Sequence, residues 1–556
     1  MNKKVCSFPI LFALLTLLIG TCAVVFPASA QAAPTSTGSI TVSGTVASSY
    51  DAYQIFSANV VDGDSDAKIA TDLAWASDAV RDAALPVLHS AGMPNSQATA
   101  QEAAEWLNTD SHLTSALSAQ LARSLQSSGA VFVALNAGTT AELPCGYWLI
   151  VADDDAIARG EAGTAPIMAL VGGGAVTVKP KAASPKVAKH VLEDGTAAWQ
   201  KAADATVADD LYWRLSATVP AGLTAYDTYT VRFVDTMSAG LDPSKVAASM
   251  RVYVAAGADG GFDAVSTDKD GRAGTEPAKG WTDITAQCAT KVAADGKTFT
   301  VRTGDLIAAL GGTEAFTAGA RVVAVYNAPL NSACNHGIAK GNPNEVYLRY
   351  PRSPLADQSG DAGFTRTPSD DACAYTWDLA LTKRGSDGDK PLAGAVLSIA
   401  DDRGRTLAAD GTWDAEGKAT VTTGEDGRVT VSGVDSGKLE VRELKAPKGY
   451  TAFEGTRSVT VKAEGLDVDQ VAAAKPKLTI TAESPLRADS ADGSTGSLEA
   501  SLINTPTGTP PSITTGGFMP STGDMAMYAA AAAAVAGAAL IVVALLVKRG
   551  GGSHKE

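Results

Sequence analysis

Short segments in which apolar and polar residues alternate recur along almost the whole chain, and glycine, aspartate or proline separates them. Examples are "SITVSGTV" at 39–46, "TYTVRFVDTM" at 228–237 and "GRVTVSG" at 427–433. Alternation with a period of two predicts strands with one buried face, and many such strands joined by turns are typical of β-sandwiches. Since 556 residues are too many for one core, we expect an all-β chain of several domains in tandem.

Proline- and glycine-containing joints divide the chain into three β-rich segments. We predict domains at 31–178, 185–352 and 373–505, with linkers at 179–186 and 353–372. The stretch 96–125 differs from its surroundings, because its apolar residues recur near a period of 3.6, and it predicts a helical insertion in the first domain. Residues 506–518 are rich in Pro, Thr and Gly and predict an extended stalk.

The two ends of the chain carry apolar stretches of different kinds. A basic start, an apolar run and a small-residue cleavage site predict that 1–30 is a secretory signal peptide. The run 525–547 is long enough to cross a bilayer as a helix, and Lys548 and Arg549 would keep the tail 548–556 in the cytoplasm. The sequence therefore predicts a protein that is exported and then held at the membrane by a transmembrane helix.

Charge and cysteine usage narrow the function further. A net charge of −15 argues against a nucleic-acid partner. Four cysteines remain after signal removal, and because they lack CxxC spacing we expect no metal site. In an oxidising exterior we favour a Cys288–Cys334 disulfide, although other pairings stay open. Nucleotide-binding and hydrolase motifs are absent from the sequence, so we expect no cofactor and no catalysis on an external substrate.

A short polar motif precedes the predicted membrane helix. This arrangement of motif, apolar span and basic tail resembles the LPxTG cell-wall sorting signal of Gram-positive bacteria, with Met in the usual Leu place. The resemblance implies that a sortase cuts between Thr and Gly through a thioester, which a primary amine then resolves by acyl transfer. The motif residues are Met519, Pro520, Ser521, Thr522 and Gly523.

The amine for this transfer is predicted from "AVTVKPKAASPK" at the first joint. The stretch resembles the WxxxVxVYPK pilin motif of Gram-positive major pilins, with Gly172 in the usual Trp place and Lys179 in the usual Tyr place. The resemblance implies that Lys181 is the inter-subunit nucleophile, and Lys179 is the rival.

The middle segment contains a lysine on an apolar strand face. Lys189 shares one face of "KVAKHV" with Val187 and Val191, and a buried unpaired lysine is costly. Domains of the resembled family carry autocatalytic Lys–Asn isopeptide bonds beside an Asp or Glu. The resemblance implies that Lys189 and Asn344 are joined, with Asp235 as the acid.

The last segment carries a closer resemblance. "LEVRELKAPKGY" is similar to the E-box of major pilins, YxLxETxAPxGY, and it supplies Glu443 as the acid. Lys383 ends the first predicted strand, "DLALTK", and Asn504 lies in the last one, "SLINTP". The resemblance implies a second isopeptide bond, between Lys383 and Asn504.

Together these motifs resemble the sortase-assembled major pilins of Gram-positive bacteria. The resemblance implies tandem immunoglobulin-like sandwiches of the CnaA and CnaB type and the function of a pilus shaft subunit at the cell wall. Its partners would be a sortase, identical and ancillary pilins, peptidoglycan and a possible host surface ligand. Two alternatives stay open: a wall-anchored adhesin that is never polymerised and binds host matrix or glycans, and an ancillary pilin at the tip or base.

Overall fold

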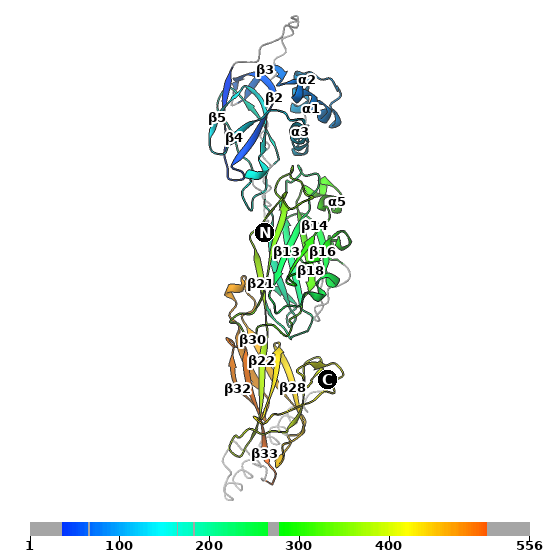
Figure 1. Cartoon of the computed structure of the whole chain (residues 1–556), viewed down its shortest axis with the longest axis vertical. Coiled ribbons are helices and arrows are strands. Elements are labelled where there is room, and N and C mark those ends of the chain that lie inside the picture. The colour runs from blue at the N-terminus through cyan, green and yellow to red at the C-terminus, as the bar shows by residue number, and fades with distance from the viewer. Residues whose placement is uncertain are drawn as a thin grey trace, which may run out of the picture.

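The computed structural model describes residues 36–64, 67–109, 111–163, 165–181, 184–264 and 277–508. Three β-rich modules follow one another along the long axis, and the three longest helices lie on the first (Figure 1). The prediction of an all-β chain with tandem domains is thereby confirmed. The predicted signal peptide, sorting motif and membrane helix lie outside the described residues. Within the described residues, no helix is long and apolar enough to cross a membrane.

The first module packs helices against a sheet, as the period of its apolar residues predicts. Tyr53, Phe56 and Leu149 on the sheet share one core with Leu88 and Leu121 on the helices. Helix α1(Asp78–Ser90) begins after its N-cap residue Ser77, ahead of the stretch 96–125 that was expected to be helical. The sheets run β3(Lys68–Trp75)-β2(Ser49–Asp62)-β6(Gly146–Ala152)-β7(Ile167–Val171), with β4(Val133–Asn136) beside β2, and β5(Thr140–Pro144)-β1(Thr37–Val42)-β8(Val176–Val178). The helices are α1(Asp78–Ser90), α2(Ala100–Asn108) and α3(Ser115–Ser128), and η2(Asp154–Ala156) follows β6.

The middle module is a sandwich of two sheets around a large apolar core. Trp213, Phe233, Phe299 and Tyr350 fill this core from both sheets and are fully buried. One sheet runs β10(Ala198–Gln200)-β9(Lys186–Glu193)-β12(Tyr212–Val219)-β18(Ala320–Asn327)-β14(Arg251–Ala256)-β15(Thr282–Asp283). The other runs β11(Ala202–Asp204)-β21(Asp370–Tyr375)-β19(Asn342–Pro351)-β13(Arg232–Met237)-β17(Thr298–Arg302)-β16(Ala289–Val292), with β20(Phe364–Arg366) beside β19. Short helices complete it: η3(Pro243–Lys245), α4(Val246–Ser249), η4(Thr285–Gln287), α5(Leu306–Ala309) and α6(Thr313–Phe316).

The stretch 353–372, expected to be a linker, instead belongs largely to this sandwich. β20 pairs with the end of β19, and β21 pairs with the start of β19 and, in parallel, with β11. The start of β21 is polar because Asp370 accepts hydrogen bonds from Lys201 and from the backbone of Lys189, and this hides the strand from a pattern search. β21 continues almost directly into the first strand of the third module (Figure 1).

The third module is a second sandwich, and its first and last strands lie side by side. One sheet runs β27(Arg428–Val434)-β22(Trp377–Gly385)-β33(Ser497–Pro506)-β29(Tyr450–Thr451), with β32(Leu486–Asp492) beside β33. The other runs β25(Trp413–Asp414)-β24(Thr406–Leu407)-β23(Val396–Ala400)-β28(Gly437–Lys445)-β30(Thr456–Glu464)-β31(Lys477–Ala482), with β26(Val421–Thr422) beside β23, and η5(Val471–Ala473) precedes β31. β22 and β33 run parallel, so the chain enters and leaves the module at opposite ends.

Candidate functional sites

The middle module brings Lys189, Asp235 and Asn344 together inside its core. All three side chains are fully buried, Lys189 on β9, Asp235 on β13 and Asn344 on β19. Because side chains alternate between the two faces of a strand, Asn344 points into the core together with Val346 and Leu348 on β19. Lys189 forms an ion pair with Asp235. Because β9 and β19 belong to different sheets, a bond from Lys189 to Asn344 would tie the two layers of the sandwich.

Tyr326, on β18, links the lysine to the asparagine, and sequence reasoning missed it. Its hydroxyl accepts hydrogen bonds from Lys189 Nζ at 2.8 Å and from Asn344 Nδ2 at 2.8 Å, and it donates to Asp235 Oδ2 at 3.0 Å. The rings of Tyr326 and Trp213 face Lys189 Nζ at 5.3 and 5.4 Å from their centroids. One hydroxyl therefore holds the amine and the amide against each other.

Burial perturbs both charged groups of this cluster. It lowers the pKa of Lys189 to about 8 and raises the pKa of Asp235. Both shifts favour moving the shared proton from the ammonium to the carboxylate. Such a transfer would leave a neutral amine, which is nucleophilic, beside a protonated acid.

The third module brings Lys383, Glu443 and Asn504 together in the same manner. Lys383 Nζ lies 4.0 Å from Glu443 Oε1, and Asn504 Nδ2 donates to the same oxygen at 2.9 Å. Lys383 Nζ also donates to the backbone carbonyl of Leu502 at 3.0 Å, and burial lowers the pKa of the amine to about 8. Here the carboxylate itself, rather than a tyrosine, contacts both reacting groups.

The two clusters differ in what a bond would connect. Lys383 pairs with Leu502 and Gly385 with Asn504 across the parallel strands β22 and β33, so the reacting residues are diagonal neighbours in one sheet. Such a bond would join the first strand of the module directly to the last. The acid comes from β28, in the facing sheet.

Three buried oxygens in these clusters have no hydrogen-bond donor among the described residues: Asp235 Oδ1, Asn344 Oδ1 and Asn504 Oδ1. A buried acceptor without a donor is costly. A protonated carboxylic acid is a donor that suits an asparagine carbonyl, and such a hydrogen bond also makes the carbonyl carbon more electrophilic. The two asparagines are therefore poised for attack by an amine.

The predicted acceptor lysine lies where the first module ends. β8 pairs with β1 up to Val178, and Lys179 and Lys181, which follow, are both exposed. The glycine in the usual Trp place is enforced by packing: Gly172 has φ +128°, and a Cβ there would lie 2.6 Å from Val60 Cβ and 2.8 Å from Cys145 Sγ. The departure from the pilin motif thus has a structural cause in the first module.

The predicted Cys288–Cys334 disulfide is wrong, since all four cysteines described are free: Cys145, Cys288, Cys334 and Cys373. Cys288 directly precedes the residue that pairs with Arg302. The residue after Cys334 donates its backbone N–H to Asn342, at the start of β19. Arg302 pairs with Arg232, which in turn pairs with Arg349, and Arg349 lies seven residues after Asn342 on β19. By strand rise the two cysteines are therefore roughly 20 Å apart, too far for a disulfide.

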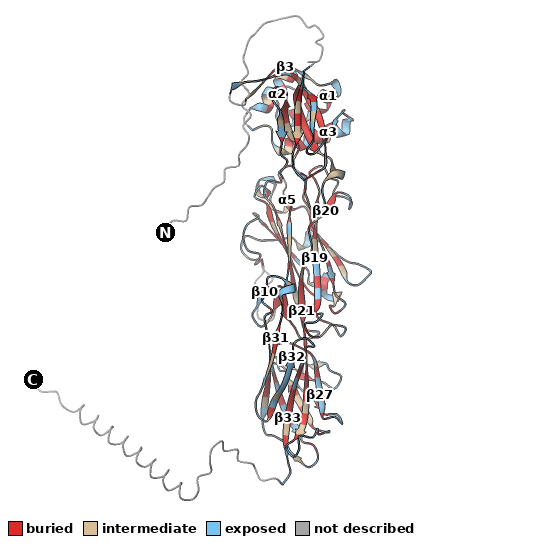
Figure 2. Cartoon of the chain, turned by 90° about the vertical axis from the view of Figure 1, so that its left-hand side faces the viewer, coloured by how far each residue is buried: buried red, intermediate tan, exposed pale blue. Residues whose placement is uncertain are grey.

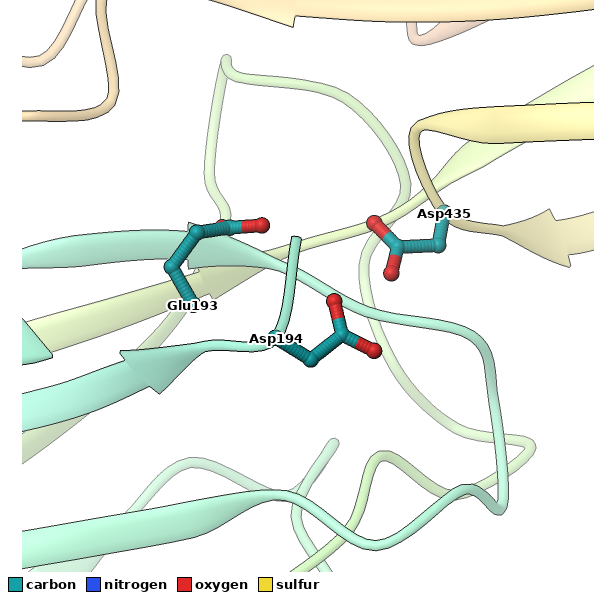
Figure 3. A group of neighbouring side chains, drawn as sticks. All are labelled: Glu193, Asp194 and Asp435. Atoms are coloured by element: carbon teal, nitrogen blue, oxygen red, sulfur yellow. The ribbon is translucent and has the colours of Figure 1, made fainter. Parts of the chain in front are cut away.

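A cluster of carboxyl groups lies where the middle and third modules meet. Glu193 and Asp194 from the end of β9 face Asp435 from the turn before β28, with oxygens within 4.8 Å of one another (Figure 3). Burial raises the pKa of Glu193 to about 8 and raises that of Asp435 well above its usual range. Asp204 joins the cluster and accepts hydrogen bonds from Trp377 at 2.6 Å and from Ser436 Oγ at 2.5 Å. The hydrogen bonds to Asp204 cross the joint, because Asp204 belongs to the middle module and both donors belong to the third.

Comparison with known proteins finds a family model that matches part of the third module. Residues 378–475 match the family model described as SpaA, prealbumin-like fold domain. The trypsin-resistant surface T6 protein of Streptococcus pyogenes serotype M6 is 30% identical over 143 residues, which are 24% of this chain and 24% of that protein. The chain therefore covers about a quarter of the length of that curated relative.

Solved structures of major pilins resemble the chain over most of its length. The T6 backbone pilin of Streptococcus pyogenes is 17% identical, with 85% of this chain and 98% of that chain covered and a TM-score of 0.46. The major pilin SpaD from Corynebacterium diphtheriae is 16% identical, with 85% and 98% covered and a TM-score of 0.41. Lys383 and Glu443 both lie in the segment 378–475 that matches the model of the SpaA prealbumin-like fold domain.

Proposed function

We propose that this chain is the shaft subunit of a covalently polymerised pilus on the surface of a Gram-positive bacterium. The observation that carries the proposal is the pair of buried clusters, Lys189–Asp235–Asn344 and Lys383–Glu443–Asn504, in two successive sandwiches. Covalent ties inside each subunit would let a filament bear tension without unzipping the hydrogen bonds between strands.

In each cluster the amine forms an isopeptide bond without any external enzyme. The proton shared by lysine and acid moves to the carboxyl group, and the neutral Nζ attacks Cγ of the asparagine. The new Cγ–Nζ bond replaces the Cγ–Nδ2 bond, and Nδ2 leaves as ammonia. Asp235 or Glu443 protonates the asparagine oxygen during attack. The carboxylate then takes a proton from the attached Nζ and passes it to Nδ2, which leaves as ammonia. When the carbonyl re-forms, the carboxylate takes back the proton that it gave to the oxygen.

Assembly between subunits uses the carboxyl end of the chain. A sortase cysteine attacks the carbonyl of Thr522 and releases the chain from Gly523 onward. The Nζ of Lys181 in the next subunit then resolves the thioester, and this transfer forms an amide. The exposure of Lys181 at the end of the first module supports this role, because an acceptor amine must be reachable. Transfer of the last Thr522 to peptidoglycan would anchor the fibre.

Replacing the acceptor lysine tests this assembly. In cells that produce Lys181→Arg, we expect the ladder of high-mass surface polymer to disappear, while the ladder persists with Lys179→Arg. A ladder that survives Lys181→Arg but not Lys179→Arg would assign the acceptor to Lys179. A ladder absent from the unmodified strain would refute the shaft role and favour the alternative of a wall-anchored adhesin or an ancillary pilin, which the incomplete pilin motif supports.

A further inference from the structure

Four arginines form a row across the outer face of one sheet of the middle module. The register pairs Arg302 with Arg232, Arg232 with Arg349, and Arg349 with Arg366, on the strands β17, β13, β19 and β20. Residues directly opposite one another on neighbouring strands share a face, and like charges in that position repel. Such a row is unexpected in a chain with a net charge of −15.

The carboxylates near this row do not balance it. Asp361 forms ion pairs with both Arg232 and Arg349, so one acid serves two guanidinium groups. Arg302 donates to the backbone carbonyl of Gln358. Arg366 stacks on the Tyr347 ring at 4.8 Å and has no acidic partner among the described residues. The loop before β20 thus neutralises the buried part of the row and leaves its outer end uncompensated.

The uncompensated end opens into a pocket of about 380 Å³ between the first and middle modules. Arg159 and Arg352 add to Arg349 and Arg366 in its wall, and none of the described residues that line it is acidic. Arg352 contacts Asp155 at 3.5 Å, but that carboxylate is almost fully exposed to solvent. Arg159 is exposed and has no acidic partner among the described residues. β20 lies at the end of the middle module nearest the first module (Figure 2).

The pocket is held open by hydrogen bonds between the two modules. Gly160 donates its N–H to Thr365 Oγ1 at 3.1 Å and accepts from the Tyr350 hydroxyl at 2.7 Å. Gly163 donates to the carbonyl of Arg352 at 2.6 Å. The wall that carries Arg159 is therefore fixed against β19 and β20, and a ligand would not need to order it.

We propose that this arginine pocket binds a phosphate or sulfate ester carried on a sugar-sized group. Guanidinium groups bind such oxyanions through paired, charge-assisted hydrogen bonds, and a multiply charged group suits several arginines better than a carboxylate does. The volume exceeds what a bare ion fills and lies in the range of small-molecule sites. Ile157, Tyr347 and Phe364 supply apolar surface for the carrier. Binding here would also tie the first module to the middle one.

Calorimetric titration of the full-length chain with a matched set of probes tests the proposal. The probes are N-acetylglucosamine, its 6-phosphate, its 6-sulfate, inorganic phosphate and inorganic sulfate. We expect saturable binding of at least one ester, weakening as salt is added, and no binding of the unesterified sugar. Inorganic phosphate that binds as tightly as the esters would identify the free ion as the occupant, which still supports an oxyanion site. Heat from no charged probe would overturn the proposal.

The double variant Arg159→Gln/Arg366→Gln locates the binding. We expect it to weaken ester binding at least tenfold, because it removes the two guanidinium groups that lack acidic partners. Arg251→Gln/Arg442→Gln, a change of equal charge at exposed positions elsewhere, should bind as the unmodified chain does. Equal affinity in the pocket variant would refute the site, and if that variant fails to fold, the probe series and the salt dependence of the unmodified chain decide instead.

Discussion

Replacing Glu443 by glutamine removes the acid of the third module while it keeps the size of the side chain. Without a carboxyl proton the carbonyl of Asn504 is not activated, so Lys383 stays a free amine. The intact chain should show a mass deficit of two ammonia molecules, about 34 Da by the condensation stoichiometry, and Glu443→Gln should show one, about 17 Da.

The missing bond also sets the size of the stability change. Lys383 and Asn504 would close a loop of about 120 residues, for which the chain-entropy model gives a stabilisation of about 5 kcal/mol. For a module of this size, that corresponds to a melting temperature lower by roughly 15 °C. The assays are intact-mass spectrometry and calorimetry of the same preparations.

Glu440→Gln is the matched control, because Glu440 lies on the same strand, is exposed and contacts Lys438 rather than the cluster. It should keep the full mass deficit and the melting temperature. A deficit of about 34 Da that survives in Glu443→Gln would refute the role of this acid. No deficit in the unmodified chain would refute the chemistry of both clusters.

Three further predictions follow from the same geometry. Asp235→Asn should remove the mass deficit of about 17 Da that comes from the Lys189–Asn344 bond. Tyr326→Phe should slow formation of this bond without abolishing it, since the acid remains. A bond that forms as fast in Tyr326→Phe as in the unmodified chain would contradict the positioning role of the hydroxyl. In single-molecule pulling, the third module should not extend, because the Lys383–Asn504 bond joins its end strands. The middle module should release no more than about 11 nm, from the 32 residues between Asn344 and the start of β22. Longer steps would exclude the ties. Because the pKa of Glu193 is raised, the folded state holds a proton that the unfolded state releases. The contribution of this group to stability is therefore full below about pH 4.5 and is lost as the pH rises to about 8. In urea titrations at pH 5 and pH 8, Glu193→Gln should reduce that loss by roughly 3 kcal/mol.

Local patterns predicted which side chains of the two clusters lie together, while the reaction between them stays a prediction. Lys383, Glu443 and Asn504 each follow from strand alternation together with a family motif, and the structure brings the three side chains together. Lys189 stood out because a lysine on an apolar strand face is costly to bury. These features depend on residues close together in sequence.

Long-range pairing limited the rest of the prediction. Residues 353–372, which include β20 and the first half of β21, were expected to be a linker. The partners of β21 are distant in sequence and its first residues are acidic. The Cys288–Cys334 pair failed because register places the two residues far apart along one sheet. Tyr326 looked like any core aromatic residue until the asparagine and the lysine were seen to share its hydroxyl.

The most direct test of the account is peptide mass spectrometry of the assembled surface polymer. The account predicts a branched peptide in which the carbonyl of Thr522 forms an amide with Nζ of Lys181, and no residue from Gly523 onward in the polymer. A surface protein that keeps its apolar tail, with Lys181 unmodified in every copy, would contradict it.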